Sequence, residues 1–218
     1  MNDILIFGTG GNCIDILDAI LALNESERAP GYRVRGFLDD NKELWGQSVQ
    51  GCQVLGPLSD AAKHSDCLFV NGVGSSRNYW RKPALLSAMK IPEERFATIV
   101  HPQANVSRFA TLGAGTVVLP MTTISSRAKV GKHVMILPNA VISHDVVVGD
   151  CTCVASGACL AGNVNIGTAC YLGANCSVTN GVRMGDFSLA GIGAVVLEDV
   201  PEKTVVVGNP ARVLRAAY

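Results

Sequence analysis

The sequence predicts an α/β domain with a small parallel sheet over residues 1–99, followed by an all-β parallel β-helix over residues 100–218. Two observations support this fold class. Strand-like and helix-like segments alternate in the first part, which is typical of a parallel sheet covered by helices. In the second part a large apolar residue recurs at every sixth position, a period that fits neither an isolated helix nor a hairpin.

The first part begins with the apolar run 3–8, which ends in glycine as a buried parallel strand would. A helix is expected next, because Ile14, Leu17 and Leu21 fall on one helical face. The order of elements indicates a small, Rossmann-like sheet. Three further strand-like or connecting segments and one further helix are expected in this part: strands 32–40, 67–75 and 96–102, and helix 78–90.

The second part carries a hexapeptide repeat. From Val100 to Met184, fifteen consecutive sixth positions hold a large apolar side chain, and four residues after each comes mostly a small or β-branched one. In a β-helix the large residue fills the interior and the small one lies beside it, while the glycines that often follow the apolar position permit the turn. With three hexapeptides per coil, fifteen units make about five coils that bury a continuous column.

Composition narrows the function classes. Lys and Arg number 18 and Asp and Glu number 18, so no global charge draws the chain to nucleic acid or an anionic membrane. No apolar run approaches the ~20 residues that a membrane span needs. The N-terminus has neither a basic segment nor a cleavage site, which predicts a cytoplasmic protein. The eight cysteines form no CxxC and have no histidines at zinc spacing, so free thiols and no metal site are expected.

The segment GTGGNC, residues 8–13, resembles a phosphate-binding loop between a strand and a helix. Cys13 stands where a dinucleotide fingerprint needs its third glycine, so NAD binding is rejected. The loop still suits a nucleotide or a sugar. Asp39 and Asp40 end the predicted strand 32–40, at the edge where ligands of open α/β sheets bind, and Gly74 belongs to the same rim. A solvated turn is the alternative for the aspartate pair.

His144 and Asp145 are adjacent polar residues inside the repeat. Ile142 and Val146 take the inward positions of their unit, so His144 is expected at a turn near the surface. One interpretation is a solvated turn histidine. The other is a general base, with Asp145 making the imidazole more basic or orienting one ring nitrogen. Adjacent turn residues need not touch, so both interpretations stay open here.

With the repeat and the C-terminal VVVGNPARVLR (205–215), the second part resembles the hexapeptide acyltransferases. The N-terminal GTGGN and GFLDDN make the whole chain similar to the bacterial acetyltransferases of 4-amino-4,6-dideoxy nucleotide sugars, and to relatives that O-acetylate sialic acid. The resemblance implies left-handed coils and a homotrimer with active sites between subunits. It also implies acetyl-CoA as co-substrate and a UDP-, dTDP- or GDP-linked sugar on the N-terminal domain.

The resemblance assigns roles to individual residues. His144 and Asp145 match the family's base and its acidic neighbour, and Gly162, one coil of 18 residues later, matches the backbone donor to the thioester carbonyl. A plain turn glycine is the alternative for Gly162. The candidate contacts for CoA are Ala174, Asn209, Pro210 and Arg212, and a merely solvated arginine is the alternative for Arg212. The glycine loop and the strand ends supply the candidate contacts for the nucleotide sugar, which are Gly10, Gly11, Asn12, Asp39, Asp40 and Gly74.

The chain departs from the family it resembles at two positions. Many relatives carry a histidine at the position of Asn12, and some carry one at the position of Cys153. The leading hypothesis is N-acetylation of a nucleotide-linked amino sugar. A sugar or sialic-acid O-acetyltransferase and a non-catalytic hexapeptide scaffold are the alternatives. A metal enzyme like the γ-carbonic anhydrases needs three converging histidines, and only His133 and His144 lie well inside the repeat, so that class is set aside.

Overall fold

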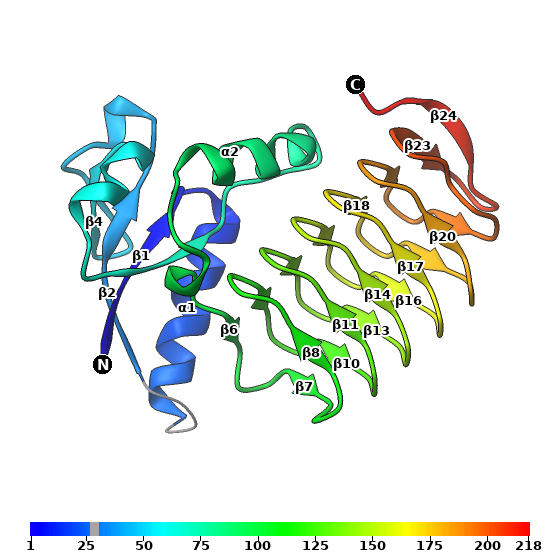
Figure 1. Cartoon of the computed structure of the whole chain (residues 1–218), viewed down its shortest axis with the longest axis horizontal. Coiled ribbons are helices and arrows are strands. Elements are labelled where there is room, and N and C mark those ends of the chain that lie inside the picture. The colour runs from blue at the N-terminus through cyan, green and yellow to red at the C-terminus, as the bar shows by residue number, and fades with distance from the viewer. Residues whose placement is uncertain (27–30) are drawn as a thin grey trace.

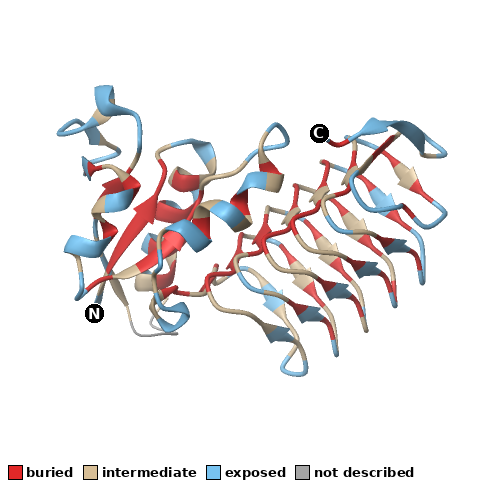
Figure 2. Cartoon of the chain, turned by 45° about the horizontal axis from the view of Figure 1, so that its top comes forward, coloured by how far each residue is buried: buried red, intermediate tan, exposed pale blue. Residues whose placement is uncertain are grey.

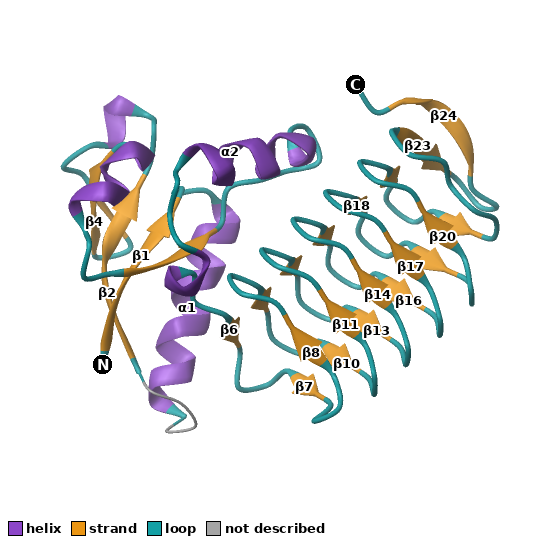
Figure 3. Ribbon diagram, viewed as in Figure 1, coloured by secondary structure: helices purple, strands orange, loops and turns teal. Residues whose placement is uncertain are grey.

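The computed structural model describes residues 1–26 and 31–218. An α/β unit at the N-terminus lies beside a stack of coils that extends away from it to the C-terminus (Figure 1). Figure 3 shows that helices are concentrated in the first unit and that the coils consist of short strands and turns. No helix within the described ranges is long and apolar enough to span a membrane.

The N-terminal sheet has five strands in the order β3-β4-β2-β1-β5. Its strands are β1 (Asn2–Phe7), β2 (Tyr32–Leu38), β3 (Ser48–Val49), β4 (Cys52–Gly56) and β5 (Leu68–Asn71). All pairings are parallel except β3 with β4, and Phe7, Phe37 and Phe69 are fully buried in the core. The β3–β4 hairpin was not predicted, because its strands are short and partly exposed and therefore form no continuous apolar run.

Outside residues 27–30, two α-helices and four short 3-10 segments accompany this sheet: α1 (Gly11–Glu25), α2 (Lys82–Ala88), η1 (Lys42–Leu44), η2 (Leu58–Lys63), η3 (Tyr79–Arg81) and η4 (Glu93–Arg95). The expected buried face of α1 was partly wrong. Leu21 is 50% exposed, while Ile16, Leu17 and Ile20 are buried, because α1 packs both on the sheet and on the first strand of the coils.

The coils form a left-handed parallel β-helix with three sheets along its length. Sheet I contains β6 (Ile99–Val100), β9 (Val117–Val118), β12 (Met135–Ile136), β15 (Cys153–Val154), β18 (Tyr171–Leu172), β21 (Leu189–Ala190), β23 (Thr204–Val207) and β24 (Arg212–Ala216). Sheet II contains β7 (Asn105–Val106), β10 (Thr123–Ile124), β13 (Val141–Ile142), β16 (Cys159–Leu160), β19 (Ser177–Val178) and β22 (Val195–Val196). Sheet III contains β8 (Thr111–Leu112), β11 (Lys129–Val130), β14 (Val147–Val148), β17 (Asn165–Ile166) and β20 (Arg183–Met184).

The hexapeptide column predicted from the sequence fills the interior. From β6 to β19, each strand pairs with the strand 18 residues later, as in Thr123 with Val141, so equivalent side chains stack. Apolar residues from Val118 to Met184 form one buried cluster, and only the first three of the column, Val100, Val106 and Leu112, are partly exposed. Figure 2 shows this buried path along the coils, with exposed residues at their outer corners.

The corners of the coils have a conformational period of their own. A residue with positive φ occurs at every sixth position from Gly115 to Gly193, and most of these residues are not glycine. The expectation that the glycines after the apolar position permit the turn was therefore wrong. Those glycines are required by close stacking: a Cβ at Gly149 would lie 2.5 Å from the Gly167 backbone of the next coil.

The α/β unit packs on sheet I and on the corner between sheets III and I. The Tyr79 hydroxyl donates to the Phe187 carbonyl at 2.9 Å, and the Lys82 ammonium donates to the His133 carbonyl at 2.5 Å. The Phe96 ring meets the edge of the His133 ring, with centroids 4.5 Å apart. These contacts fix the N-terminal unit to one side of the β-helix.

Candidate active site

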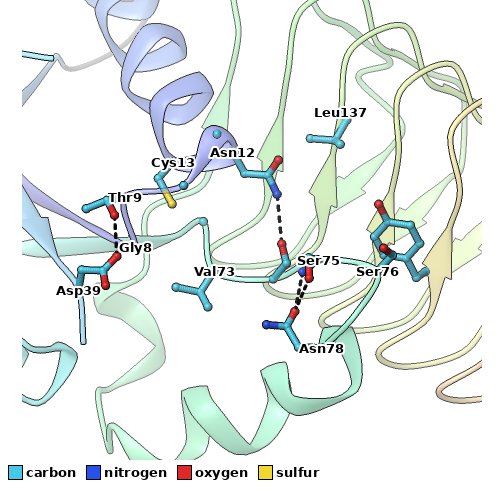
Figure 4. A pocket seen from close by; sticks show the side chains of 15 residues that line it. Gly8, Thr9, Asn12, Cys13, Asp39, Val73, Ser75, Ser76, Asn78 and Leu137 are labelled. Carbon is cyan, nitrogen blue, oxygen red and sulfur yellow. Dashed lines mark hydrogen bonds between the residues drawn. The ribbon is translucent and has the colours of Figure 1, made fainter. Parts of the chain in front are cut away.

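A cleft of about 470 Å³ lies between the α/β unit and sheet I. Figure 4 shows its lining side chains, which come from the glycine loop, from the end of β2 and from the segment after β5. Leu137 and Tyr171 of the β-helix complete the wall. A cleft of this size is typical of sites for ligands such as nucleotides.

The glycine loop forms the inner end of this cleft. Gly8 has φ +90, and a Cβ there would lie 2.8 Å from both Cys13 Sγ and Val73 Cγ2, so only glycine fits. The N–H groups of Gly11 and Asn12, at the start of the 15-residue helix α1, donate to no acceptor among the described residues. Free N–H groups and the helix dipole together favour an anionic ligand group at this point.

The predicted pair of aspartates separates in the structure. Asp39 lines the cleft, where its carboxylate accepts hydrogen bonds from the Thr9 hydroxyl and the Asn41 N–H, both at 2.8 Å. Asp40 is not part of the cleft lining and accepts at 3.0 Å from the N–H of Leu58, the first residue of η2. Of the two, only Asp39 is therefore placed to contact a ligand in the cleft.

Asn12 and Gly74 meet across the cleft. The Asn12 amide donates to the Gly74 carbonyl at 3.4 Å, a long and weak hydrogen bond (Figure 4). Ser75 and Asn78 form a local hydrogen-bonded turn beside it, and this polar turn was not anticipated from the sequence. The predicted residues Gly10, Gly11, Asn12, Asp39 and Gly74 all line this one cleft.

His144 and Asp145 form the two-residue turn between β13 and β14, at the corner between sheets II and III. Asp145 takes the left-handed conformation at φ 60, which a short polar side chain tolerates better than most. Its carboxylate oxygen Oδ2 lies 2.8 Å from His144 Nδ1, so the two adjacent residues do touch. The His144 side chain is 52% exposed, and its Nε2 has no hydrogen-bond partner among the described residues.

Asp145 has a second partner that the sequence did not reveal. Arg127 binds both carboxylate oxygens, with Nε–Oδ1 at 2.6 Å and Nη2–Oδ2 at 2.7 Å. Hydrogen bonds from Arg127, and then from His144, hold the pKa of Asp145 well below its usual range. The three side chains thus form a chain of contacts in which Asp145 stays ionised and His144 Nδ1 faces an acceptor.

Gly162 lies directly over the His144 ring, one coil farther on. A Cβ at Gly162 would lie 2.7 Å from His144 Cε1 and 2.8 Å from Nε2, so the ring occupies the space a side chain would need. The Gly162 N–H forms no hydrogen bond among the described residues, although the residue is buried. A base and an unused backbone donor are therefore adjacent.

The residues that the resemblance assigns to CoA are not gathered in one cavity of the single chain. Ala174 lies at the corner between sheets I and II, away from Gly162 at the corner between sheets II and III. Asn209 and Pro210 form a cis peptide in the turn after β23, and Arg212 lies in a groove at the C-terminal end of the coils. Gly162 and Ala174 therefore lie on opposite borders of sheet II.

The two halves of the predicted site are separated within one chain. The cleft opens on sheet I, whereas His144 stands at the corner between sheets II and III, which lies opposite sheet I in the triangular coil. Cys153, on β15 of sheet I, is on the side of the cleft and not beside His144. All eight cysteines are free thiols, as expected.

Comparison with known proteins agrees with this architecture. The family model "bacterial transferase hexapeptide (six repeats)" matches residues 127–162. No curated protein matches the sequence. Among solved structures, the acetyltransferase domain of PglB from Neisseria gonorrhoeae is 26% identical with a TM-score of 0.84, covers 98% of this chain and 100% of its own, and is also known in complex with acetyl coenzyme A.

Two further solved structures share the fold at 24% identity. PerB from Caulobacter crescentus, in complex with CoA and GDP-perosamine, has a TM-score of 0.83 and covers 99% of this chain and 98% of its own. WeeI from Acinetobacter baumannii has a TM-score of 0.82 and covers 98% of this chain and 100% of its own. The matched repeat and the near-complete structural overlap show that the chain shares the two-part fold of the PglB acetyltransferase domain, and this likeness supports an acyltransferase.

Proposed function

We propose that this protein is an acetyl-CoA-dependent N-acetyltransferase that acts on the 4-amino group of a nucleotide-linked 4-amino-4,6-dideoxy sugar. One observation carries the proposal. His144, hydrogen-bonded to Asp145 through Nδ1, presents its other ring nitrogen toward Gly162, whose N–H is unused. A base beside a residue with a free backbone N–H is what direct acyl transfer to an amine requires.

The chemistry assigned to these residues is direct attack. Acetyl-CoA supplies the acetyl group, and the sugar's amine is the nucleophile. His144 Nε2 takes a proton from the attacking nitrogen, and the Gly162 N–H donates to the carbonyl oxygen as negative charge develops there. The proton is then available to the departing thiolate of CoA. No cysteine or serine acyl-enzyme is needed.

The cleft on sheet I is assigned to the nucleotide sugar. The free N–H groups at the start of α1 suit the diphosphate, and the carboxylate of Asp39 suits N–H donors of a base or sugar hydroxyls. UDP-, dTDP- and GDP-linked sugars are all candidates, and the GDP-perosamine bound to PerB is an example of this substrate class. The CoA contacts are assigned to Gly162, Ala174, Asn209, Pro210 and Arg212.

Because the cleft and His144 lie on opposite sides of one β-helix, the proposal includes a homotrimer whose active sites combine two subunits. The CoA residues on both borders of sheet II support this arrangement, since one groove between subunits can receive contacts from both chains. A cytoplasmic location is part of the proposal, because both proposed substrates are cytoplasmic metabolites.

The test of the activity is acetyl transfer to UDP-, dTDP- and GDP-linked amino sugars, detected by mass spectrometry because eight cysteines would react with thiol dyes. A product one acetyl group heavier, lost in His144→Gln but kept in the distant control His64→Gln, supports the proposal. Acetylation of sialic acid or sugar hydroxyls alone would replace it by O-acetylation. No transfer and no CoA binding would identify a scaffold.

The shared site is tested by complementation between two inactive variants. Asp39→Ala impairs the cleft, and His144→Gln removes the base. If each active site takes its cleft from one chain and its base from another, a mixed oligomer contains sites in which the His144→Gln chain supplies an intact cleft and the Asp39→Ala chain supplies an intact base. Co-expression at equal levels should restore roughly a quarter of wild-type activity, because one interface in four combines the two intact halves. No recovery, despite mixed oligomers, would place both halves in one chain.

A further inference from the structure

We propose that Arg127 is a positioning residue for the base His144 and that it acts through Asp145. This inference rests on the proposed function and deepens it. The observation is the two-pronged contact of the Arg127 guanidinium with the Asp145 carboxylate, at 2.6 and 2.7 Å, on an aspartate that also contacts His144 Nδ1 at 2.8 Å.

The backbone of the β-helix fixes this geometry. Arg127 and Asp145 are 18 residues apart, and both take the left-handed conformation at the same corner of consecutive coils, with φ 61 and φ 60. The Asp145 N–H donates to the Ser126 carbonyl at 3.1 Å, which ties the two turns together. The two side chains therefore leave the backbone in register, and the ion pair does not depend on a flexible loop.

The planar guanidinium fork restrains the carboxylate in a way that a single hydrogen bond cannot. With both oxygens engaged, Asp145 cannot rotate freely, so Oδ2 stays directed at His144 Nδ1. An ionised carboxylate accepts only, so the proton stays on Nδ1 and the lone pair stays on Nε2, on the side of Gly162. Arg127 thus sets the tautomer and direction of the base without touching a substrate.

The positive charge of Arg127 has a second effect. An aspartate alone beside an imidazole favours the protonated ring, which cannot act as a base. The guanidinium offsets part of that charge, so Asp145 orients His144 with less net negative charge beside the ring. A further charged group near this turn is Lys129 of β11, which lines the same groove as Arg127, and Arg108 lies at the same corner of the preceding coil. The next coil contributes Gly162 and Asn163, neither of which titrates.

The test compares Arg127→Gln and Arg127→Lys with the control Lys129→Gln, an exposed cation in the same groove that does not touch Asp145. In Arg127→Gln, kcat should fall about 10-fold at pH 7 with both KM values within about twofold, since the ring is misdirected but the substrates still bind. The acid limb of the pH–rate profile should move to higher pH. Arg127→Lys should restore the wild-type position of the acid limb but only part of kcat. Lys129→Gln should change neither the acid limb nor kcat.

A readout independent of activity completes the test. The ¹⁵N shifts of the His144 ring should report the Nδ1–H tautomer in the wild type, and the midpoint of the His144 titration should rise in Arg127→Gln. In an Asp145→Asn background, Arg127→Gln should add no further loss of kcat. An unchanged tautomer and titration, or a loss found only in KM, would overturn the inference. An inactive wild type with the expected titration shift would refute the proposed function and leave the Arg127 inference standing.

Discussion

Replacing Gly162 by alanine tests the contact between the base and the coil above it. The new Cβ would lie 2.7 Å from His144 Cε1 and 2.8 Å from Nε2, whereas ordinary contacts begin near 3.4 Å, so the ring must retreat by about 0.6–0.7 Å. Gly162 does not have positive φ, so alanine introduces no backbone strain. The imidazole is the end of a flexible side chain, and the fold should therefore tolerate the change.

Catalysis should not tolerate it. A base displaced by more than half an ångström from its aspartate and from the acceptor should lower kcat/KM by about 10- to 100-fold, or about 1.4–2.7 kcal/mol of transition-state stabilisation. Initial rates of acetyl transfer by mass spectrometry measure this loss, and a thermal unfolding midpoint within about 2 °C of wild type would show an intact fold. Because the effect passes through the ring, Gly162→Ala should add little in a His144→Ala background. Activity within twofold of wild type, or an equal loss in both backgrounds, would refute this reasoning.

Two further predictions concern the cleft and the joint between the units. Asp39→Ala should raise the Kd of the nucleotide sugar more than about 10-fold in calorimetry, because it removes a charged acceptor from the cleft, whereas Asp40→Ala should leave that Kd unchanged and cost about 1 kcal/mol of stability through the lost Leu58 cap. Equal effects of the two variants on binding would contradict the assignment. Burial lowers the pKa of His133 to about 4, and its Nδ1 has no partner, so the folded protein resists a proton that the unfolded chain binds near pH 6.5. Stability should therefore be full above about pH 6.5 and decline toward pH 4 by about 2 kcal/mol, which is less than the roughly 3 kcal/mol of the full shift because the ring is partly exposed to screening solvent. His133→Asn, which suits φ 53, should remove most of that decline in urea unfolding. An equally acid-sensitive variant would exclude His133 as the cause.

The β-helix could be predicted from the sequence because large apolar side chains recur in it at every sixth position. A stack of coils buries such an uninterrupted series of apolar residues in one continuous core. In the structure this core continues for two further strands, through Ala190 and Val196. The corner conformations were less accessible. Positive φ at residues such as Arg127 and His133 is imposed by the coils above and below and not by local preference.

The candidate site was predictable in part for the same reason. His144 follows from the inward positions of Ile142 and Val146, which force it to a turn. Arg127 was missed because it is distant in sequence, although its spacing of 18 residues from Asp145 is one coil and could have revealed the pair. Asp39 and Asp40 have different positions because the N–H of Leu58 in η2 donates to Asp40 and not to Asp39. That tertiary contact leaves no periodic signal in the sequence.

The central claim is that His144 is the base of an acetyl transfer to a nucleotide-linked amino sugar. The most direct measurement is the rate of that transfer by the wild type and by His144→Gln, with mass-spectrometric detection across the panel of UDP-, dTDP- and GDP-linked amino sugars. The account predicts an N-acetylated product with at least one of them and a loss of at least about 100-fold in the variant. A wild type that acetylates none of these amines, or a variant that is as active as the wild type, would contradict it.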